Sequence, residues 1–348
     1  MKSPRRIAVK MDAVIENQDV LFPQVFSHLE SVESSATPLD EELLRRAARS
    51  LDSSSPKLIL WRLLDTGERI LQTIQQDPQP LTRLLERVIS LIPFDELKQS
   101  ISTDKLELGL QSLSSSIQLL CLAYISKAAD TPSGASFVAS TSTLMQTLLN
   151  TWLSTENTEI ADRALQVIEA LLLVDNTNNV TVVVSGEQVG EAQGQGLIWR
   201  RIFHDPAVYA ILFEWTSLVR SNRDIKTKKG LQLVTISQAR LFDFVARSAQ
   251  LDWSAVTTSS LPSIESQYIQ EDGSDRLYGG LLRYAASHMI DRGDILMEVL
   301  RQEFFIKLLQ VIEEKNPSSV SPRLLEAIQQ GAGMESTKKE SEDVGMHL

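Results

Sequence analysis

The stretch Gly194–Val219 constrains the fold of this chain more than any other. It reads GQGLIWRRIFHDPAVYAILFEWTSLV, in which two apolar segments, 197–203 and 207–219, are separated by His-Asp-Pro. Asp205 stands where a helix N-cap belongs and Pro206 stands at the first helical position, so together they signal the start of a helix. Two apolar helices joined by a sharp turn are the unit from which helical solenoids are stacked.

The composition indicates a folded helical protein. Of the 348 residues 43% are hydrophobic, and there are 15 glycines and 12 prolines, whereas a disordered chain would be poorer in apolar residues. No apolar run reaches the roughly 20 residues that span a bilayer, and the basic N-terminus lacks the apolar segment of a signal peptide. The single cysteine, Cys121, fits a reducing compartment. We expect a cytoplasmic and nuclear protein without membrane contact.

Helical periodicity recurs along most of the chain. Apolar residues repeat at spacings of three and four with charged residues opposite them, which predicts amphipathic helices. Helix pairs recur roughly every 40 to 50 residues, the period of HEAT and armadillo arrays. The expected fold class is therefore all-α, an ARM/HEAT-like α-solenoid of stacked helix pairs, and an irregular α-bundle is the alternative. The predicted helices are 39–51, 57–74, 81–91, 104–127, 137–153, 158–174, 231–251, 275–290, 294–314 and 321–330.

The pattern divides the chain into three parts. We expect a weakly ordered N-terminal segment over 1–38, the solenoid over 39–330 and a disordered polar tail over 331–348. Periodicity stops within 176–196, which contains the β-branched run 180–184 and four glycines. We interpret this stretch as a Gly-containing, partly extended insertion, either a strand or a hairpin.

No catalytic residue, metal site or cofactor is expected. The chain has four histidines, and none has a second His, Cys or carboxylate at metal-ligand spacing on a shared face. His204 lies beside Asp205, but adjacent residues at a turn point apart and Asp205 is needed as a cap, which favours a simple turn histidine. Cys121 lies between two leucines of a predicted helix and is expected to pack as a small apolar residue.

The glycines at the end of the insertion suggest a phosphate cradle, but the pattern fails. Gly190, Gly194 and Gly196 match neither common phosphate-binding spacing, and Glu187 and Glu191 would repel a phosphate. A flexible insertion is therefore favoured. An enzyme with a diverged site in this insertion remains a third-ranked hypothesis.

Basic residues cluster directly after the second apolar helix. The net charge of −11 argues against nucleic acid as the main ligand, but a basic loop on an acidic protein can dock an acidic partner segment. An ordinary solvated loop is an equally weighted alternative, and packing between repeats is the alternative for the two arginines at 200 and 201. The candidate partner-binding residues are Arg200, Arg201, Arg220, Arg223, Lys226, Lys228 and Lys229.

Three stretches carry a family resemblance. They are GQGLIWRRIFHDPAVYAILFEWTS from Gly194, LQVIEALLLVDNTNNVTVV over Leu165–Val183, and RLYGGLLRYAASHMIDRGDILMEVLRQEFFIKLLQ from Arg276. They resemble fungal relatives of the HEAT-repeat proteasome assembly chaperone, often labelled "DNA mismatch repair protein HSM", whose animal counterpart is a non-ATPase proteasome subunit homologue. The resemblance is clearest over Leu165–Glu314, and the N-terminal half fits as generic helical repeats.

The resemblance implies a non-catalytic scaffold. Members of this family bind the C-terminal domain of an ATPase subunit of the proteasome base and hold it during ordered assembly. We therefore expect a monomer whose partner is a proteasomal base ATPase, with no direct nucleic-acid contact. A nuclear protein-interaction factor acting in DNA mismatch repair is the alternative.

Overall fold

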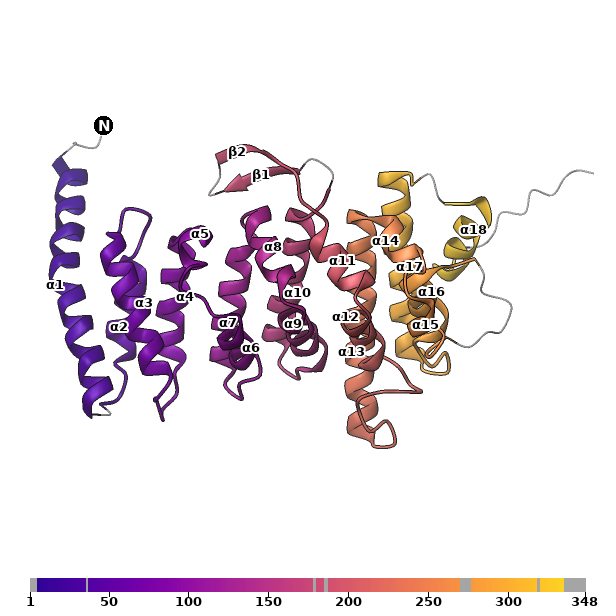
Figure 1. Cartoon of the computed structure of the whole chain (residues 1–348), viewed down its shortest axis with the longest axis horizontal. Coiled ribbons are helices and arrows are strands. Elements are labelled where there is room, and N and C mark those ends of the chain that lie inside the picture. The colour runs from indigo at the N-terminus through magenta and orange to yellow at the C-terminus, as the bar shows by residue number, and fades with distance from the viewer. Residues whose placement is uncertain are drawn as a thin grey trace, which may run out of the picture. The chain divides into compact units, whose positions relative to one another are not determined.

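The computed structural model describes residues 5–35, 37–177, 180–184, 187–269, 277–317 and 320–334. The chain divides into two compact units, Met1–Ile198 and Trp199–Leu348, here called unit 1 and unit 2 (Figure 1). Both units are built from helices packed against neighbouring helices, so the predicted all-α solenoid class is confirmed. The proposed division at residues 38 and 330 stays a prediction, and most of the 331–348 tail lies outside the described residues.

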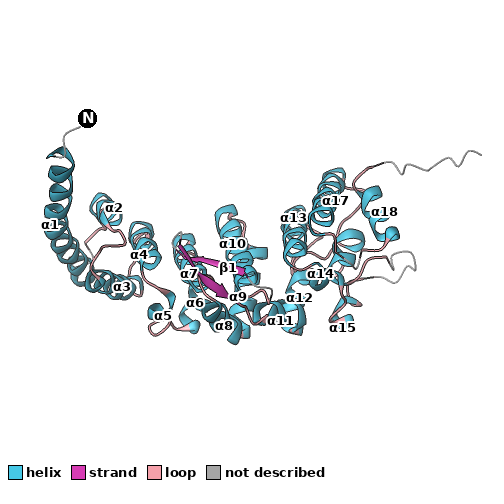
Figure 2. Ribbon diagram, turned by 90° about the horizontal axis from the view of Figure 1, so that it is seen from above, coloured by secondary structure: helices cyan, strands magenta, loops and turns pink. Residues whose placement is uncertain are grey.

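Unit 1 has two layers of helices. The row α2, α4, α7 and α10 packs consecutively, and α3, α6 and α9 pack behind it (Figure 2). Long α1 contacts both α2 and α3. The helices are α1 (Arg5–Ser35), α2 (Glu41–Ser50), α3 (Lys57–Leu71), α4 (Gln79–Leu91), α5 (Phe94–Leu97), α6 (Thr103–Leu110), α7 (Ser115–Ala128), α8 (Pro132–Ser140), α9 (Ser142–Ser154) and α10 (Thr158–Val174).

The core of unit 1 consists of the apolar stripes that the sequence predicts. Leu44, Leu84 and Leu148 are each 0% exposed, and burial of such a side chain contributes about 1.5 to 3 kcal/mol. Helix α10 has the predicted bounds, because the Asn157 side chain accepts hydrogen bonds from the backbone N–H groups of Glu159 and Ile160. The local capping contact and the buried apolar stripe therefore both favour a helix over these residues.

The prediction of a single helix over 104–127 is wrong. Helix α6 ends at Leu110, α7 begins at Ser115, and Leu113 between them is fully exposed. The Gln118 side chain donates a hydrogen bond of 2.8 Å to the Leu110 carbonyl oxygen and closes the turn. Serine side chains compete with helical hydrogen bonds, and this serine-rich turn is where the chain reverses. The predicted helix 137–153 is likewise divided, between α8 and α9.

The insertion forms a hairpin. Strand β1 (Val180–Val184) pairs antiparallel with β2 (Glu187–Ala192), with a register shift between Val182 and Val183. Of the two interpretations left open for this stretch, the described residues show the hairpin, and β-branched residues supply its first strand.

Asp175 closes the base of this hairpin. Its buried carboxylate accepts hydrogen bonds from the backbone N–H groups of Gln195, at 3.1 Å, and Ile198, at 2.5 Å. The Gly196 N–H donates to the Asp175 carbonyl oxygen at 3.0 Å. A Cβ on Gly194 would lie 2.1 Å from the Asp175 carbonyl carbon, so only glycine fits at that crossing. These contacts therefore hold together the two chain segments from which the hairpin extends.

Unit 2 is organised around two long helices. Helix α13 packs along α17, which in turn packs on α18. Of the predicted helix 275–290, residues 275 and 276 lie outside the described residues. The described part begins later than predicted, with α16 at Gly280, and a π-helix at Tyr284–His288 follows. The helices are α11 (Leu197–His204), which crosses the boundary between the units in sequence, α12 (Pro206–Glu214), α13 (Lys228–Leu251), α14 (Trp253–Thr257), α15 (Pro262–Glu265), α16 (Gly280–Arg283), α17 (Ile295–Lys315) and α18 (Pro322–Gly331).

The helix–turn–helix predicted from Gly194–Val219 is present. The Asp205 side chain accepts a hydrogen bond of 3.0 Å from the Ala207 N–H and caps α12. Trp199 is 9% exposed and its ring stacks on Phe203 at 5.6 Å, so it belongs to the core. Helix α12 ends at Glu214, five residues earlier than predicted. Beyond it, Ser217 Oγ accepts hydrogen bonds from the backbone N–H groups of Val219 and Arg220, in place of helical carbonyl oxygens.

Helix α17 does not have the fully covered surface that its wide apolar stripe predicts. Phe304 and Leu308 are buried, whereas Ile295 is 82%, Leu296 66% and Val299 46% exposed. Thus the middle of α17 packs between α13 and α18, while one face of its first two turns, at Ile295, Leu296 and Val299, is not covered by the described part of unit 2.

Candidate functional site

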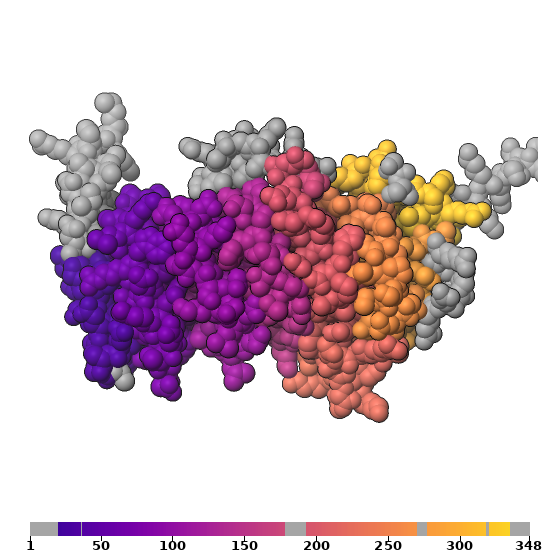
Figure 3. All heavy atoms as spheres, in the orientation of Figure 1, coloured from indigo at the N-terminus to yellow at the C-terminus, as the bar shows by residue number. Residues whose placement is uncertain are grey.

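The basic loop, residues 220–229, connects α12 to α13 and protrudes at the lower end of α13 (Figures 1 and 3). The Arg223 guanidinium lies 5.2 Å from the centre of the Trp215 ring, a cation–π contact. Arg220 Nη1 donates to Gln267 Oε1 at 3.3 Å. Two of its arginines are therefore held against unit 2.

The lysines of the basic loop point to solvent. Lys226, Lys228 and Lys229 are exposed, and the last two lie in the first turn of α13. The helix dipole places positive charge at that end, so lysines there weaken the helix rather than stabilise it.

The other two predicted residues lie on α11 and behave differently from each other. Arg200 is exposed. Arg201 is half-buried, and its Nη1 forms a 2.8 Å ion pair with Asp205, one helical turn later. This contact supports the packing alternative for Arg201, whereas Arg200 stays a candidate for partner contact.

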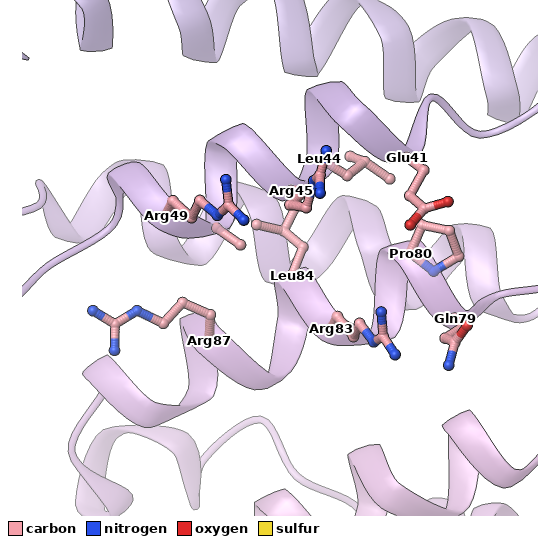
Figure 4. A pocket seen from close by; sticks show the side chains of 10 residues that line it. Glu41, Leu44, Arg45, Arg49, Gln79, Pro80, Arg83, Leu84 and Arg87 are labelled. Atoms are coloured by element: carbon pink, nitrogen blue, oxygen red, sulfur yellow. The ribbon is translucent and has the colours of Figure 1, made fainter.

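A second basic surface, which sequence reasoning missed, lies in unit 1. We call it the arginine groove, a cavity of about 480 Å³ between α2 and α4 (Figure 4). Each helix contributes two arginines four residues apart. The lining residues are Glu41, Leu44, Arg45, Ala48 and Arg49 of α2, and Gln79, Pro80, Arg83, Leu84 and Arg87 of α4.

The four arginines of the groove are held to different degrees. Arg87 donates from Nε and Nη2 to the Leu51 carbonyl oxygen, at 3.2 and 2.7 Å, and is fixed in place. Arg45 pairs with Glu42 on its own helix. Arg49 and Arg83 are exposed and make no hydrogen bond or ion pair within the described part of the chain. Two guanidinium groups are thus available to a ligand.

Glu86 on α4 lies near this basic surface. Burial raises the pKa of its carboxyl, and the nearby guanidinium groups of Arg163 and Arg83 offset part of that effect. The local excess of positive charge therefore does not fully compensate for the loss of water around Glu86.

A further groove, of about 660 Å³, lies between α3, α6 and α7. It is mainly apolar, with exposed Leu108 at its edge, and the Tyr124 hydroxyl donates to Glu68 inside it. Burial, with a smaller contribution from Glu68, raises the pKa of the Cys121 thiol in this groove to about 12. A thiol of that pKa stays protonated at neutral pH, which agrees with the packing role expected for Cys121.

The described residues contain no group of three or more His, Cys, Asp or Glu side chains that could hold a metal ion. His204 is exposed at the end of α11, and Asp205 contacts Ala207 and Arg201. In the described part of the chain, none of the helices has the length and hydropathy that crossing a bilayer would require.

Stacked helix pairs with grooves between neighbouring helices define a HEAT-like α-solenoid, a class that binds other proteins along its layers. The model of the family described as "DNA mismatch repair protein HSM3, N terminal domain" matches residues 23–187. This match agrees with the family that the sequence resembles, and the resemblance is confirmed over these residues. No curated protein matches the chain.

The family match lies on a different part of the chain from most of the quoted motifs. It covers the N-terminal half, which fitted only as generic repeats, and overlaps the clearest resemblance only over 165–187. The arginine groove falls inside the match, and the basic loop falls outside it. The whole of the family match therefore lies in unit 1.

Proposed function

We propose that this protein is a non-catalytic scaffold that binds the C-terminal domain of a proteasomal ATPase subunit during assembly of the regulatory-particle base. The observation that carries the proposal is the family match over 23–187, together with the assembly role that the resemblance implies. The architecture suits this role, because a two-layered helical stack offers one long face for a folded partner.

Two features of unit 1 support binding by this face. The row α2, α4, α7 and α10 is continuous, and the arginine groove opens between its first two members. The helix row would supply a large complementary surface, and the positive charge of the arginine groove would fix the register of the bound partner.

The test is a pull-down of the full chain with the isolated C-terminal domain of each base ATPase, in parallel and at two salt concentrations. We expect one domain to be retained selectively, with weaker retention at high salt. Retention of none of the domains at either salt concentration would contradict the proposal.

A second candidate function follows from the printed family description, which names DNA mismatch repair. With a net charge of −11, the chain would take part through a protein partner and not by direct DNA contact. A gel shift with duplex DNA tests for direct DNA contact. Tight binding with a steep salt dependence would favour direct action in repair over the scaffold function.

An enzymatic site in the insertion can be tested by replacing its two strands. Replacing residues 180–192 with a short Gly-Ser linker should leave partner binding intact, because Asp175 and its partners close the base without the strands. Nucleotide turnover by the parent chain that this replacement abolishes would instead support the enzyme hypothesis.

A further inference from the structure

We propose that the arginine groove binds an acidic segment of a partner protein that carries two carboxylates one helical turn apart. The groove itself is argued from unit 1 alone. Only the identity of the partner, an ATPase of the proteasome base, rests on the proposed function.

The spacing of the arginines sets the spacing of the ligand's charges. Arg45 and Arg49 are four residues apart on α2, as are Arg83 and Arg87 on α4, which corresponds to about 6 Å along each helix axis. In Figure 4 the N-terminal ends of both helices, at Glu41 and Gln79, lie at the same end of the groove. The arginines therefore form two tiers, each with one guanidinium from each helix.

An acidic helix matches these tiers. Carboxylates at positions i and i+4 of a helix are also separated by about 6 Å along its axis. Guanidinium groups bind carboxylates through paired, charge-assisted hydrogen bonds, which are about twice as strong as neutral ones. Arg49 and Arg83, exposed and without an ion pair in the described residues, are placed to make them, and Arg87 is already held by Leu51.

The groove also has an apolar part. Ala48 and Pro80 are half-buried on its walls, above buried Leu44 and Leu84. A volume of about 480 Å³ accommodates a few side chains. The matching ligand is therefore an amphipathic segment with an apolar residue beside its carboxylates, and not a free anion.

The acidic surroundings favour a short protein segment over nucleic acid. Glu41 lines one end of the groove and Glu42 is paired with Arg45, so a continuous polyanion would meet negative charge at that end. The whole chain carries a net charge of −11. A long phosphate backbone gains little from four arginines in that field, whereas a segment with two carboxylates contacts only the arginines and does not extend past Glu41.

The experiment measures fluorescence anisotropy of a labelled helical peptide with glutamates at i and i+4, added to the full chain. A peptide with glutamine at those positions and a labelled DNA duplex serve as the comparison probes. The binding variant is Arg49→Glu with Arg83→Glu, and the matched control is Arg292→Glu with Arg323→Glu, an equal charge change at two exposed arginines of unit 2. Because all four residues are exposed, circular dichroism melts should agree with the parent chain.

We expect the acidic peptide to bind the parent chain and the unit 2 control alike, and the groove variant at least ~10-fold more weakly. The glutamine peptide should lose a similar factor. Arg49→Ala with Arg83→Ala, which adds no negative charge, should show a smaller loss in the same direction. Equal binding of the acidic peptide to parent and groove variant would overturn the inference, as would tighter, arginine-dependent binding of the duplex.

The two proposals fail separately. If a selected ATPase domain binds the groove variant as tightly as the parent chain, the groove is not its contact, and the inference fails while the scaffold function stands. If no ATPase domain binds but the acidic peptide does so through Arg49 and Arg83, the inference stands and the scaffold function fails.

Discussion

At the scale of single residues, Asp175 shows how a buried carboxylate can fix a local structure. It is 0% exposed and accepts backbone hydrogen bonds from Gln195 and Ile198 across the base of the hairpin. A buried carboxylate costs free energy unless it is hydrogen-bonded, so the burial of Asp175 depends on the backbone N–H groups that it accepts from. Asp175 therefore couples the end of α10 to the start of α11.

Asp175→Ala should lower the free energy of unfolding by about 2 to 4 kcal/mol, since the part-buried N–H of Gln195 and the buried N–H of Ile198 lose their acceptor. Chemical denaturation followed by circular dichroism measures the effect. Asp162→Ala, at an exposed position of the same helix, is the control and should change stability by less than about 0.5 kcal/mol. Equal effects of the two variants would show that the Asp175 contacts contribute nothing.

At the scale of elements, the turn between α6 and α7 decides which residues of a predicted stripe are buried. Leu110 is 1% exposed and Leu113 is fully exposed, although both belong to one periodic pattern in the sequence. In a single continuous helix both side chains would face the same layer. The chain reversal places only Leu110 in the core.

The two leucines provide a direct test of this turn. Leu110→Ala should destabilise unit 1 by about 2 to 5 kcal/mol, because it leaves a cavity, whereas Leu113→Ala should have an effect of less than about 0.5 kcal/mol. Thermal melts of the two variants give the comparison. Similar losses for both would indicate the continuous helix instead.

Glu86 predicts a pH effect on α4. Because burial raises the pKa of its carboxyl above the ordinary 4.5, the folded state binds the proton more tightly than the unfolded state. Its contribution to stability is present below pH 4.5 and is lost as the pH rises through the folded-state pKa. Glu86→Gln should therefore raise the melting temperature near pH 7, and the difference should shrink towards pH 4. A melting temperature that falls at pH 7 would show that the arginine contacts outweigh burial.

At the scale of the whole molecule, the described residues of this acidic protein include two basic surfaces. The arginine groove belongs to unit 1 and the basic loop to unit 2. Charges on exposed loops act mainly on association rates, while those in grooves also contribute to specific contacts. The two surfaces should therefore differ in their kinetic effects.

Reversing the charges of Arg223, Lys226, Lys228 and Lys229 should slow association with an acidic partner several-fold at low salt and leave dissociation nearly unchanged. Stopped-flow binding to the ATPase domain selected by pull-down measures both rates. The effect should vanish at high salt, where screening shortens the range of the charges. An unchanged association rate at low salt would show that the basic loop is an ordinary solvated loop.

Only part of the candidate site could be predicted from sequence. The basic loop was identified because its residues are adjacent in the chain. The arginine groove was missed because each i, i+4 arginine pair alone is typical of a solvated helix face. Its two halves are more than 30 residues apart, and only the packing of α2 on α4 brings them together.

The sequence by itself determined where several helices begin, because capping is a local contact between a side chain and the next backbone N–H groups. Asn157, Asp205 and Ser321 all cap the helices predicted to start there. Tertiary structure decided what lies on each surface: the exposed face at the start of α17, the closed base of the hairpin and the arginine groove. These depend on which neighbour covers each face, and periodicity indicates that a face is apolar without specifying what covers it.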